Sequence, residues 1–232
     1  MPSELRDKLL DAALNHVPFD GWGGATLLTA ADDIGVSEAD ARAAFPRGAV
    51  EMAAAFHARG DDAMVVRMRG EEFEALRYSE KVAAAVRYRL EVVEDKELVR
   101  RGTTLFSLPL NATEGARLIW GTVDRIWVEL GDTSDDINWY SKRTILSGVY
   151  GSCVLFWLGD TSTNHAATWE FVDRRIANVM QFEKLKAKVR GNKVLSGLFA
   201  IPNSFLSGIK APSKHTRDDL PGRWTKPNQE NK

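Results

Sequence analysis

Apolar side chains recur every three or four residues along most of this chain, the spacing that places them on one face of an α-helix. Ser3 can cap a first helix, and Pro18 and Gly21 should end it. Ser37 can cap a later short helix, and Pro46 can open the long helix that follows it. No segment shows the sustained alternation of strands or a hairpin turn signal. The pattern predicts an all-α protein, with further helices over about residues 24–34, 37–45, 46–64, 71–94, 98–105, 116–130, 136–158 and 164–188.

A helix-turn-helix unit is predicted near the N-terminus. The segment "IGVSEADARAAFPRGAVEMAAAF" resembles the turn and recognition helix of TetR-type repressors. DNA affinity comes mainly from Lys and Arg that neutralise phosphates. Residues 32–47 carry four acidic and two basic side chains, so we expect no nucleic-acid binding. The unit then represents a retained fold, and a TetR-type ligand-responsive transcriptional regulator is the alternative.

The composition gives little sign of catalysis. One cysteine, Cys153, lies in an apolar run and is better read as a core residue than as a nucleophile. The four histidines are scattered and predict no metal site, and no phosphate-binding glycine loop or nucleophile elbow is present. We expect a protein that is not an enzyme and holds no cofactor, although an isolated acid or base in a pocket stays open.

Charge is distributed unevenly along the chain. Residues 184–232 carry eleven basic and three acidic side chains, a net charge of +8, so the overall charge of −1 leaves −9 for residues 1–183. Residues 191–210 have one apolar helical face with basic flanks, which is typical of a helix that lies in a membrane interface. A core helix, a partner-contact helix or a solvated tail is the competing interpretation. The apolar face comprises Val194, Leu195, Leu198, Phe199, Phe205, Leu206 and Ile209.

The two central predicted helices, 116–130 and 136–158, offer a candidate lipid pocket. The second is apolar around most of its circumference and also carries small residues, which allow either close helix packing or space for a ligand. Plain core packing is the simpler interpretation for each position. The candidate lipid-binding residues are Ile119, Val123, Trp127, Ile145, Val149, Tyr150 and Val154.

The segment "GDTSDDINWYSKRTILSGVYGSCVLFWLGDTS" carries the most specific resemblance. Together with "LLDAALNHVPFDGW" and "TWEFVDRRI", it resembles the ubiquinone (coenzyme Q) biosynthesis accessory lipid-binding protein family over about residues 4–210. The chain start shows no transit peptide, which favours a bacterial member.

The resemblance implies a TetR-like helical fold that holds an isoprenoid lipid or quinone intermediate. It also implies a homodimer that reaches the membrane surface through its C-terminal helix and assists the di-iron demethoxyubiquinone hydroxylase. We therefore expect a cytoplasmic protein, peripheral on the inner membrane. Its hydroxylase surface would comprise Asp124, Ile126, Trp139, Tyr140 and Arg143.

Four units follow from these patterns. They are a helix-turn-helix-like unit (1–70), a lipid-binding helical core (71–190), an amphipathic membrane-associating helix (191–210) and a disordered polar tail (211–232).

Overall fold

The computed structural model describes the backbone of residues 2–191 and 211, and the side chains from residue 4 to residue 181. Within these residues the chain contains helices and no strand, which confirms the all-α prediction. The predicted membrane helix (191–210) and polar tail (211–232) fall almost entirely outside the described residues.

The N-terminal unit consists of α1 (Pro2–Asp20), α2 (Gly24–Asp33) and α3 (Glu38–Ala44). Helix α1 continues through Pro18 and ends at Gly21, whose φ of +75° a residue with a side chain rarely adopts. The Ser37 hydroxyl accepts the backbone N–H of Asp40 at 3.2 Å, which confirms the predicted cap of α3. Apolar side chains of all three helices form a separate small core that also includes Leu98.

The middle of the chain forms α4 (Ala49–Met68), α5 (Glu71–Glu74), α6 (Tyr78–Glu91) and α7 (Lys96–Ser107). The prediction that Pro46 opens the long helix is wrong, because residues 46–48 make a turn in which Gly48 has a φ of +55°. The helix predicted over 71–94 is divided, since Glu80 accepts the backbone N–H of Arg77 at 2.9 Å and starts α6 afresh.

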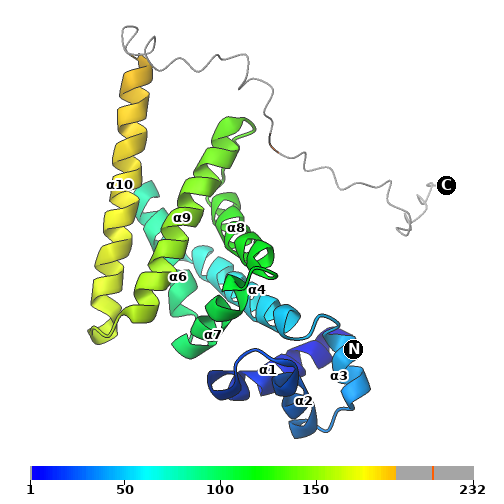
Figure 1. The fold of residues 1–232 in the computed structure, drawn as a ribbon. Helices are drawn as coiled ribbons and strands as arrows, with labels where there is room; N and C mark the ends of the chain where they lie inside the picture. Colours follow the sequence, from blue (N-terminus) through cyan, green and yellow to red (C-terminus); the bar gives the residue numbers. More distant parts are fainter. Residues whose placement is uncertain (1, 192–210, 212–232) are drawn as a thin grey trace, which may run out of the picture.

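The last helices are α8 (Ala112–Glu129), α9 (Ile137–Gly159) and α10 (Ala166–Gly191), with a short 3-10 turn at Thr163–His165 between the last two. Figure 1 shows α9 lying between α10 on one side and α8 on the other, with α4 and α6 behind them and the N-terminal unit at one end. The larger core lies between these helices and is distinct from that of the N-terminal unit. Helix α7 joins the two, because the Trp22 indole N–H donates to the Leu98 carbonyl at 3.1 Å.

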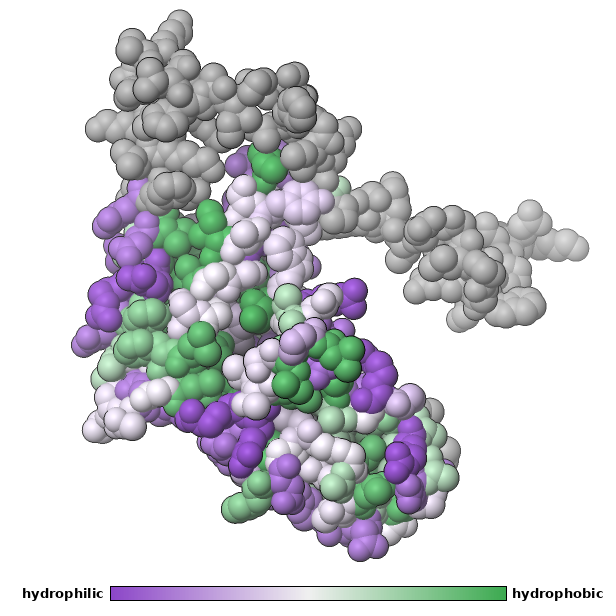
Figure 2. All heavy atoms as spheres, in the orientation of Figure 1, coloured by the Kyte–Doolittle hydropathy of each residue, from purple (hydrophilic) through white to green (hydrophobic). Residues whose placement is uncertain are grey.

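Hydrophobic side chains also gather on the outer surface over α9 and α10 (Figure 2). Phe156 of α9 stacks on Phe171 of α10 with ring centroids 4.4 Å apart, and Phe156 is 37% exposed. Among the described residues, no helix has the length and apolar character needed to cross a membrane.

Candidate functional site

A cavity of about 420 Å³ lies where α4, α6, α7, α8 and α9 meet. Its volume is within the range of about 300–1,000 Å³ that is usual for small-molecule sites. Most of its wall is apolar or aromatic. The lining includes Trp22, Phe56, Leu90, Val93, Leu98, Val99, Phe106, Leu118, Ile119, Val154, Leu155 and Trp157.

One end of the cavity opens toward the turn between α7 and α8. Ser107 and Ala112, which flank this turn, line the cavity and are exposed to solvent. The turn beside them carries Leu108 and Leu110, whose side chains are 51% and 93% exposed. An apolar molecule that enters here meets an apolar rim before it meets the interior.

The other end of the cavity is polar and buried. Arg89 is 4% exposed and donates from Nε to an Asp61 carboxylate oxygen at 2.6 Å and from Nη2 to the His57 carbonyl at 3.0 Å. The Thr122 hydroxyl donates to the same Asp61 oxygen at 2.9 Å, and the His57 ring nitrogen Nε2 lies 2.8 Å from that hydroxyl. His57, Arg89 and Tyr150 all line the cavity. We call these five residues the polar cluster.

Electrostatics keep this cluster neutral overall. Burial, followed by the charge of Arg89, lowers the pKa of His57 to about 4, so its imidazole is uncharged at neutral pH. Burial raises the pKa of Tyr150, and its phenol stays protonated. Burial lowers the pKa of Arg89, but its pKa is raised overall, and the Asp61 carboxylate that pairs with it favours the charged guanidinium. The positive charge of Arg89 is then balanced by the negative charge of Asp61.

Gly60 allows this arrangement. A Cβ at residue 60 would lie 2.7 Å from Arg89 Nη1 and 2.8 Å from Cζ, which is closer than atoms of this kind approach one another. The guanidinium therefore packs against the backbone of α4. Glycine inside a helix costs about 1 kcal/mol relative to alanine, so its place in α4 has a packing reason here.

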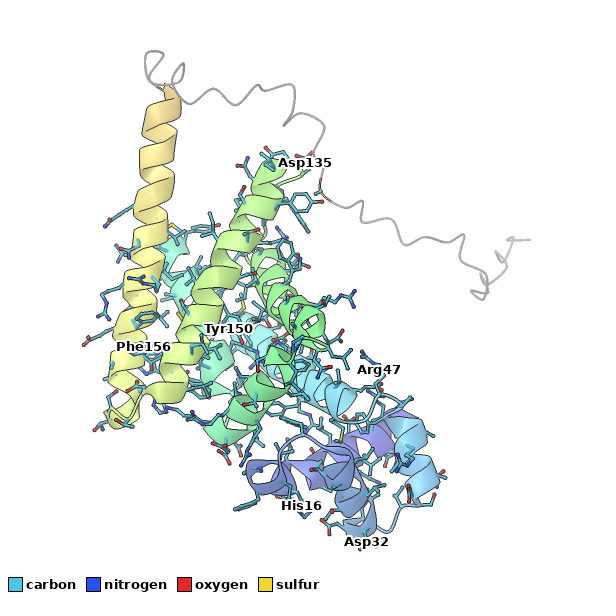
Figure 3. All side chains as sticks on the ribbon, viewed as in Figure 1. His16, Asp32, Arg47, Asp135, Tyr150 and Phe156 are labelled. Atoms are coloured by element: carbon cyan, nitrogen blue, oxygen red, sulfur yellow. The ribbon has the colours of Figure 1, made fainter. Side chains whose placement is uncertain are left out.

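Of the predicted lipid-binding residues, the structure places three in the cavity wall: Ile119, Tyr150 and Val154. Val123, Trp127 and Val149 are buried in the larger core and do not line the cavity, and Ile145 is half-buried away from it. Figure 3 shows Tyr150 on the side of α9 away from α10, whereas Phe156 lies toward α10.

Four residues of the polar cluster were not predicted from the sequence: His57, Asp61, Arg89 and Thr122. His57 and Asp61 are four residues apart and so share one face of α4, a signal that treating the histidines as scattered overlooked. Arg89 and Thr122 carry no such local signal, because they reach Asp61 only through tertiary packing. Among the described residues, no group of three His, Cys, Asp or Glu side chains could hold a metal ion.

The predicted hydroxylase surface divides into exposed and buried parts. Ile126 is fully buried, so it cannot contribute to a surface, and Arg143 is 2% exposed. Arg143 donates to Asp124 at 2.6 Å and to Asp132 at 3.0 Å, and its guanidinium lies 4.0 Å from the centre of the Trp139 ring. The position of Arg143 is therefore that of a support beneath the surface.

Two aromatic rings of the predicted surface lie above this support. The rings of Trp139 and Tyr140 meet edge to face at 4.8 Å, and Trp120 lies 5.9 Å from Trp139. Trp139 and Tyr140 are half-buried, and Asp124 keeps 40% of its side chain exposed. We call Trp120, Trp139 and Tyr140 the aromatic cluster.

The helix order and packing define a TetR-like all-α protein. The TetR transcriptional regulator from Nitrosomonas europaea superposes with a TM-score of 0.63, covering 75% of this chain and 97% of that one at 20% sequence identity, which shows a shared fold.

Sequence comparison shows which proteins this chain is similar to. Residues 112–183 match the COQ9 family. The probable ubiquinone biosynthesis protein coq9 of Dictyostelium discoideum is 29% identical over 216 residues, covering 89% of this chain and 68% of that protein. The COQ9 protein of Rattus norvegicus is 27% identical over 219 residues, covering 89% and 70%. The resemblance to the ubiquinone biosynthesis family is confirmed, since both the family match and these relatives are COQ9 proteins. The names of both relatives include "mitochondrial", and the bacterial origin expected from the sequence stays a prediction.

Proposed function

We propose that this protein is a non-catalytic, lipid-binding accessory protein of ubiquinone biosynthesis, which presents an isoprenoid quinone intermediate to the di-iron demethoxyubiquinone hydroxylase at a membrane. The observation that carries the proposal is the apolar cavity of about 420 Å³ in a homologue of ubiquinone biosynthesis proteins. The TetR-like fold alone does not support this function, since one fold serves many functions.

The cavity suits an amphiphile with a long apolar tail. Its walls are apolar, and its mouth at the α7–α8 turn is surrounded by exposed leucines. Transfer of apolar surface from water into such a wall contributes about 25 cal/mol per Å². A long polyprenyl tail exceeds the volume of the cavity, so its far end would leave through the mouth and could remain in a bilayer.

The aromatic cluster supplies the proposed contact with the hydroxylase. Tryptophan and tyrosine are enriched in the energetic centres of protein interfaces. Beneath them, Arg143 fixes the start of α9 against α8 through Asp124 and Asp132. We assign the contact to Trp139, Tyr140 and Asp124, and we give Arg143 the role of holding them in place.

Membrane docking and dimerisation are two further parts of the proposed function. Residues 191–210 would dock the protein on the inner membrane as a peripheral protein, and the chain would act as a homodimer. Deletion of residues 193–232 should abolish binding to liposomes that contain anionic lipid, because it removes both the apolar face and basic residues of this segment. Unchanged binding would refute the membrane assignment.

Two glycines of α9 provide the test of the cavity. A Cβ at Gly151 or at Gly148 meets nothing within 4 Å, so each position accepts a larger side chain without backbone strain. Gly151 lines the cavity and Gly148 is exposed outside it. Gly151→Leu should fill the cavity, whereas Gly148→Leu is the matched control with the same gain in helix propensity.

The measurement is native mass spectrometry with lipid extraction, on protein purified without detergent from a ubiquinone-producing host. Wild type and Gly148→Leu should carry quinone or isoprenoid lipid, and Gly151→Leu should carry much less. Lipid-free wild type, or equal lipid in all three proteins, would refute lipid binding in this cavity.

The hydroxylase contact is tested separately. Trp139→Ala combined with Tyr140→Ala should weaken binding to demethoxyubiquinone hydroxylase by at least ~2 kcal/mol, the loss expected for interface hot spots. Phe19→Ala, which removes an 81% exposed ring on α1, is the control and should leave the affinity unchanged. Equal affinity of the double variant and wild type would refute the assignment.

The runner-up function is a TetR-type regulator. Helix α3 exposes Glu38 and Asp40, and its one basic residue, Arg42, is engaged by Glu38 at 2.7 Å. Such a helix repels phosphates, so we propose that the protein does not bind DNA. A salt-sensitive gel shift with genomic fragments at submicromolar protein would contradict this.

A further inference from the structure

We propose that the polar cluster is the recognition site for the head of the bound amphiphile, and that it selects a neutral head bearing carbonyl or hydroxyl oxygens over an anionic one. This inference rests on the proposed function, because it concerns the same cavity. It adds an orientation, head inward and tail toward the α7–α8 turn, and a chemical basis for selection.

The buried ion pair between Arg89 and Asp61 is costly to the protein. Arg89 and Asp61 are 4% and 4% exposed, and they lie beside an apolar cavity. Taking two charges out of water costs several kcal/mol for each ion, and apolar replacements of similar volume are often at least as stable. A buried charged group in the wall of a cavity is therefore a candidate for ligand recognition.

Arg89 and Tyr150 offer hydrogen-bonding groups to a ligand in the cavity. Nε and Nη2 of Arg89 are used within the protein, but Nη1 has no hydrogen-bond partner among the residues that the structure describes. The Thr122 hydroxyl lies 2.9 Å from an Asp61 carboxylate oxygen and 2.8 Å from His57 Nε2, so these three side chains are hydrogen-bonded to one another. Arg89 lines the cavity and keeps the protons of Nη1 for a ligand oxygen, and the Tyr150 phenol, which is hydrogen-bonded to Thr122, can still accept from a ligand.

The polar cluster carries no net charge that an anionic ligand could neutralise. Asp61 already compensates Arg89, and His57 is uncharged at neutral pH. A carboxylate or diphosphate head would therefore add an uncompensated charge to a buried, apolar site, which costs several kcal/mol. A quinone carbonyl or a phenol hydroxyl would add only hydrogen bonds. The cluster thus fits the ring of a quinone or a prenylated phenol.

Polar and exposed residues line different parts of the cavity. His57, Arg89 and Tyr150 come from α4, α6 and α9 and form its less exposed part, whereas Ser107 and Ala112 beside the α7–α8 turn are exposed. A ligand whose head enters first satisfies the polar end and leaves its tail among apolar side chains. The reverse orientation would bury Arg89 Nη1 against hydrocarbon.

The experiment compares three probes of similar tail length: a short-chain ubiquinone, a prenyl diphosphate and a head-less isoprenoid hydrocarbon. Binding is followed by quenching of tryptophan fluorescence, because Trp22 and Trp157 line the cavity. Wild-type protein should bind the ubiquinone at least ~10-fold more tightly than either other probe, the effect of one charge-assisted hydrogen bond.

Two variants test the residues. Asp61→Leu combined with Arg89→Met replaces the ion pair by apolar side chains of similar length, and Tyr150→Phe removes one hydroxyl. The double variant should lose the preference for ubiquinone over the hydrocarbon. Tyr150→Phe should lower the affinity for ubiquinone and leave the affinity for the hydrocarbon unchanged. The wild-type preference needs no variant, so the test stands even if the double variant does not fold.

The outcomes separate the two proposals. Equal affinity for all three probes, with loss of binding in Gly151→Leu, would refute head recognition and leave lipid binding intact. Tighter binding of the prenyl diphosphate than of the ubiquinone would refute the preference for a neutral head. Failure of wild type to bind any probe would refute both proposals.

Discussion

Gly60 provides a sharp test of the packing around Arg89. Alanine in place of glycine inside a helix ordinarily stabilises a protein by about 0.8–1 kcal/mol. At residue 60 the added Cβ would meet the Arg89 guanidinium at 2.7–3.0 Å. This group cannot move away freely, because Asp61 and the His57 carbonyl hold two of its nitrogens. Overpacking of this kind costs about 1–3 kcal/mol.

We therefore expect Gly60→Ala to lower the free energy of unfolding, by up to about 2 kcal/mol once the gain in helix propensity offsets part of the overpacking. Gly148→Ala is the matched control, since its Cβ meets nothing within 4 Å, and it should raise the free energy of unfolding by about 0.8–1 kcal/mol. Urea unfolding followed by circular dichroism measures both changes. A stabilised Gly60→Ala variant would show that the guanidinium moves readily and that Gly60 has no packing role.

Three further predictions follow from other buried groups. Arg143→Met should lower the free energy of unfolding by about 3 kcal/mol, because buried Asp132 keeps only Lys142 as a cationic partner, and an unchanged denaturation midpoint would contradict this. Burial opposes ionisation of Asp132, but hydrogen bonds from Lys142, Ser134 and Arg143 hold its pKa well below the ordinary value. The contribution of ionised Asp132 to the free energy of unfolding is therefore fully present above about pH 4, and it is lost as the pH falls further. Thermal melts between pH 2 and 6 should show this loss, and a smaller loss in Asp132→Asn. Burial raises the pKa of Cys153 to about 11, so its thiol should react with a disulfide reagent at pH 8 only after unfolding, and rapid reaction of the folded protein would contradict its core placement.

The two candidate sites differ in how much local sequence could reveal. The aromatic cluster was found in part from a motif, because Trp139 and Tyr140 are adjacent in sequence and Arg143 follows one turn later. The depth of each side chain was not contained in the motif. Arg143 is buried and Trp139 is half-buried on the same helix face, since α8 and the loop before α9 bring Asp124 and Asp132 to one side only.

The cavity could be predicted less well. Helical periodicity identifies which residues of α8 and α9 face inward, and all the candidates except Ile145 are buried or line the cavity. Periodicity cannot separate a residue that fills the core from one that borders a void, because both present the same apolar face. That distinction depends on how far apart the helices lie, as Val123 and Ile119 of α8 show.

The sequence by itself determined the all-helical class, the cap of α3, the acidic character of the helix-turn-helix unit and the relationship to ubiquinone biosynthesis proteins. Each of these depends on local spacing, local charge or a continuous motif. Only the tertiary structure brought together Asp61, Arg89 and Thr122 from three helices and left an apolar cavity beside them. The reason is that a buried charge finds its partners, and a cavity its walls, only after helices distant in sequence have packed.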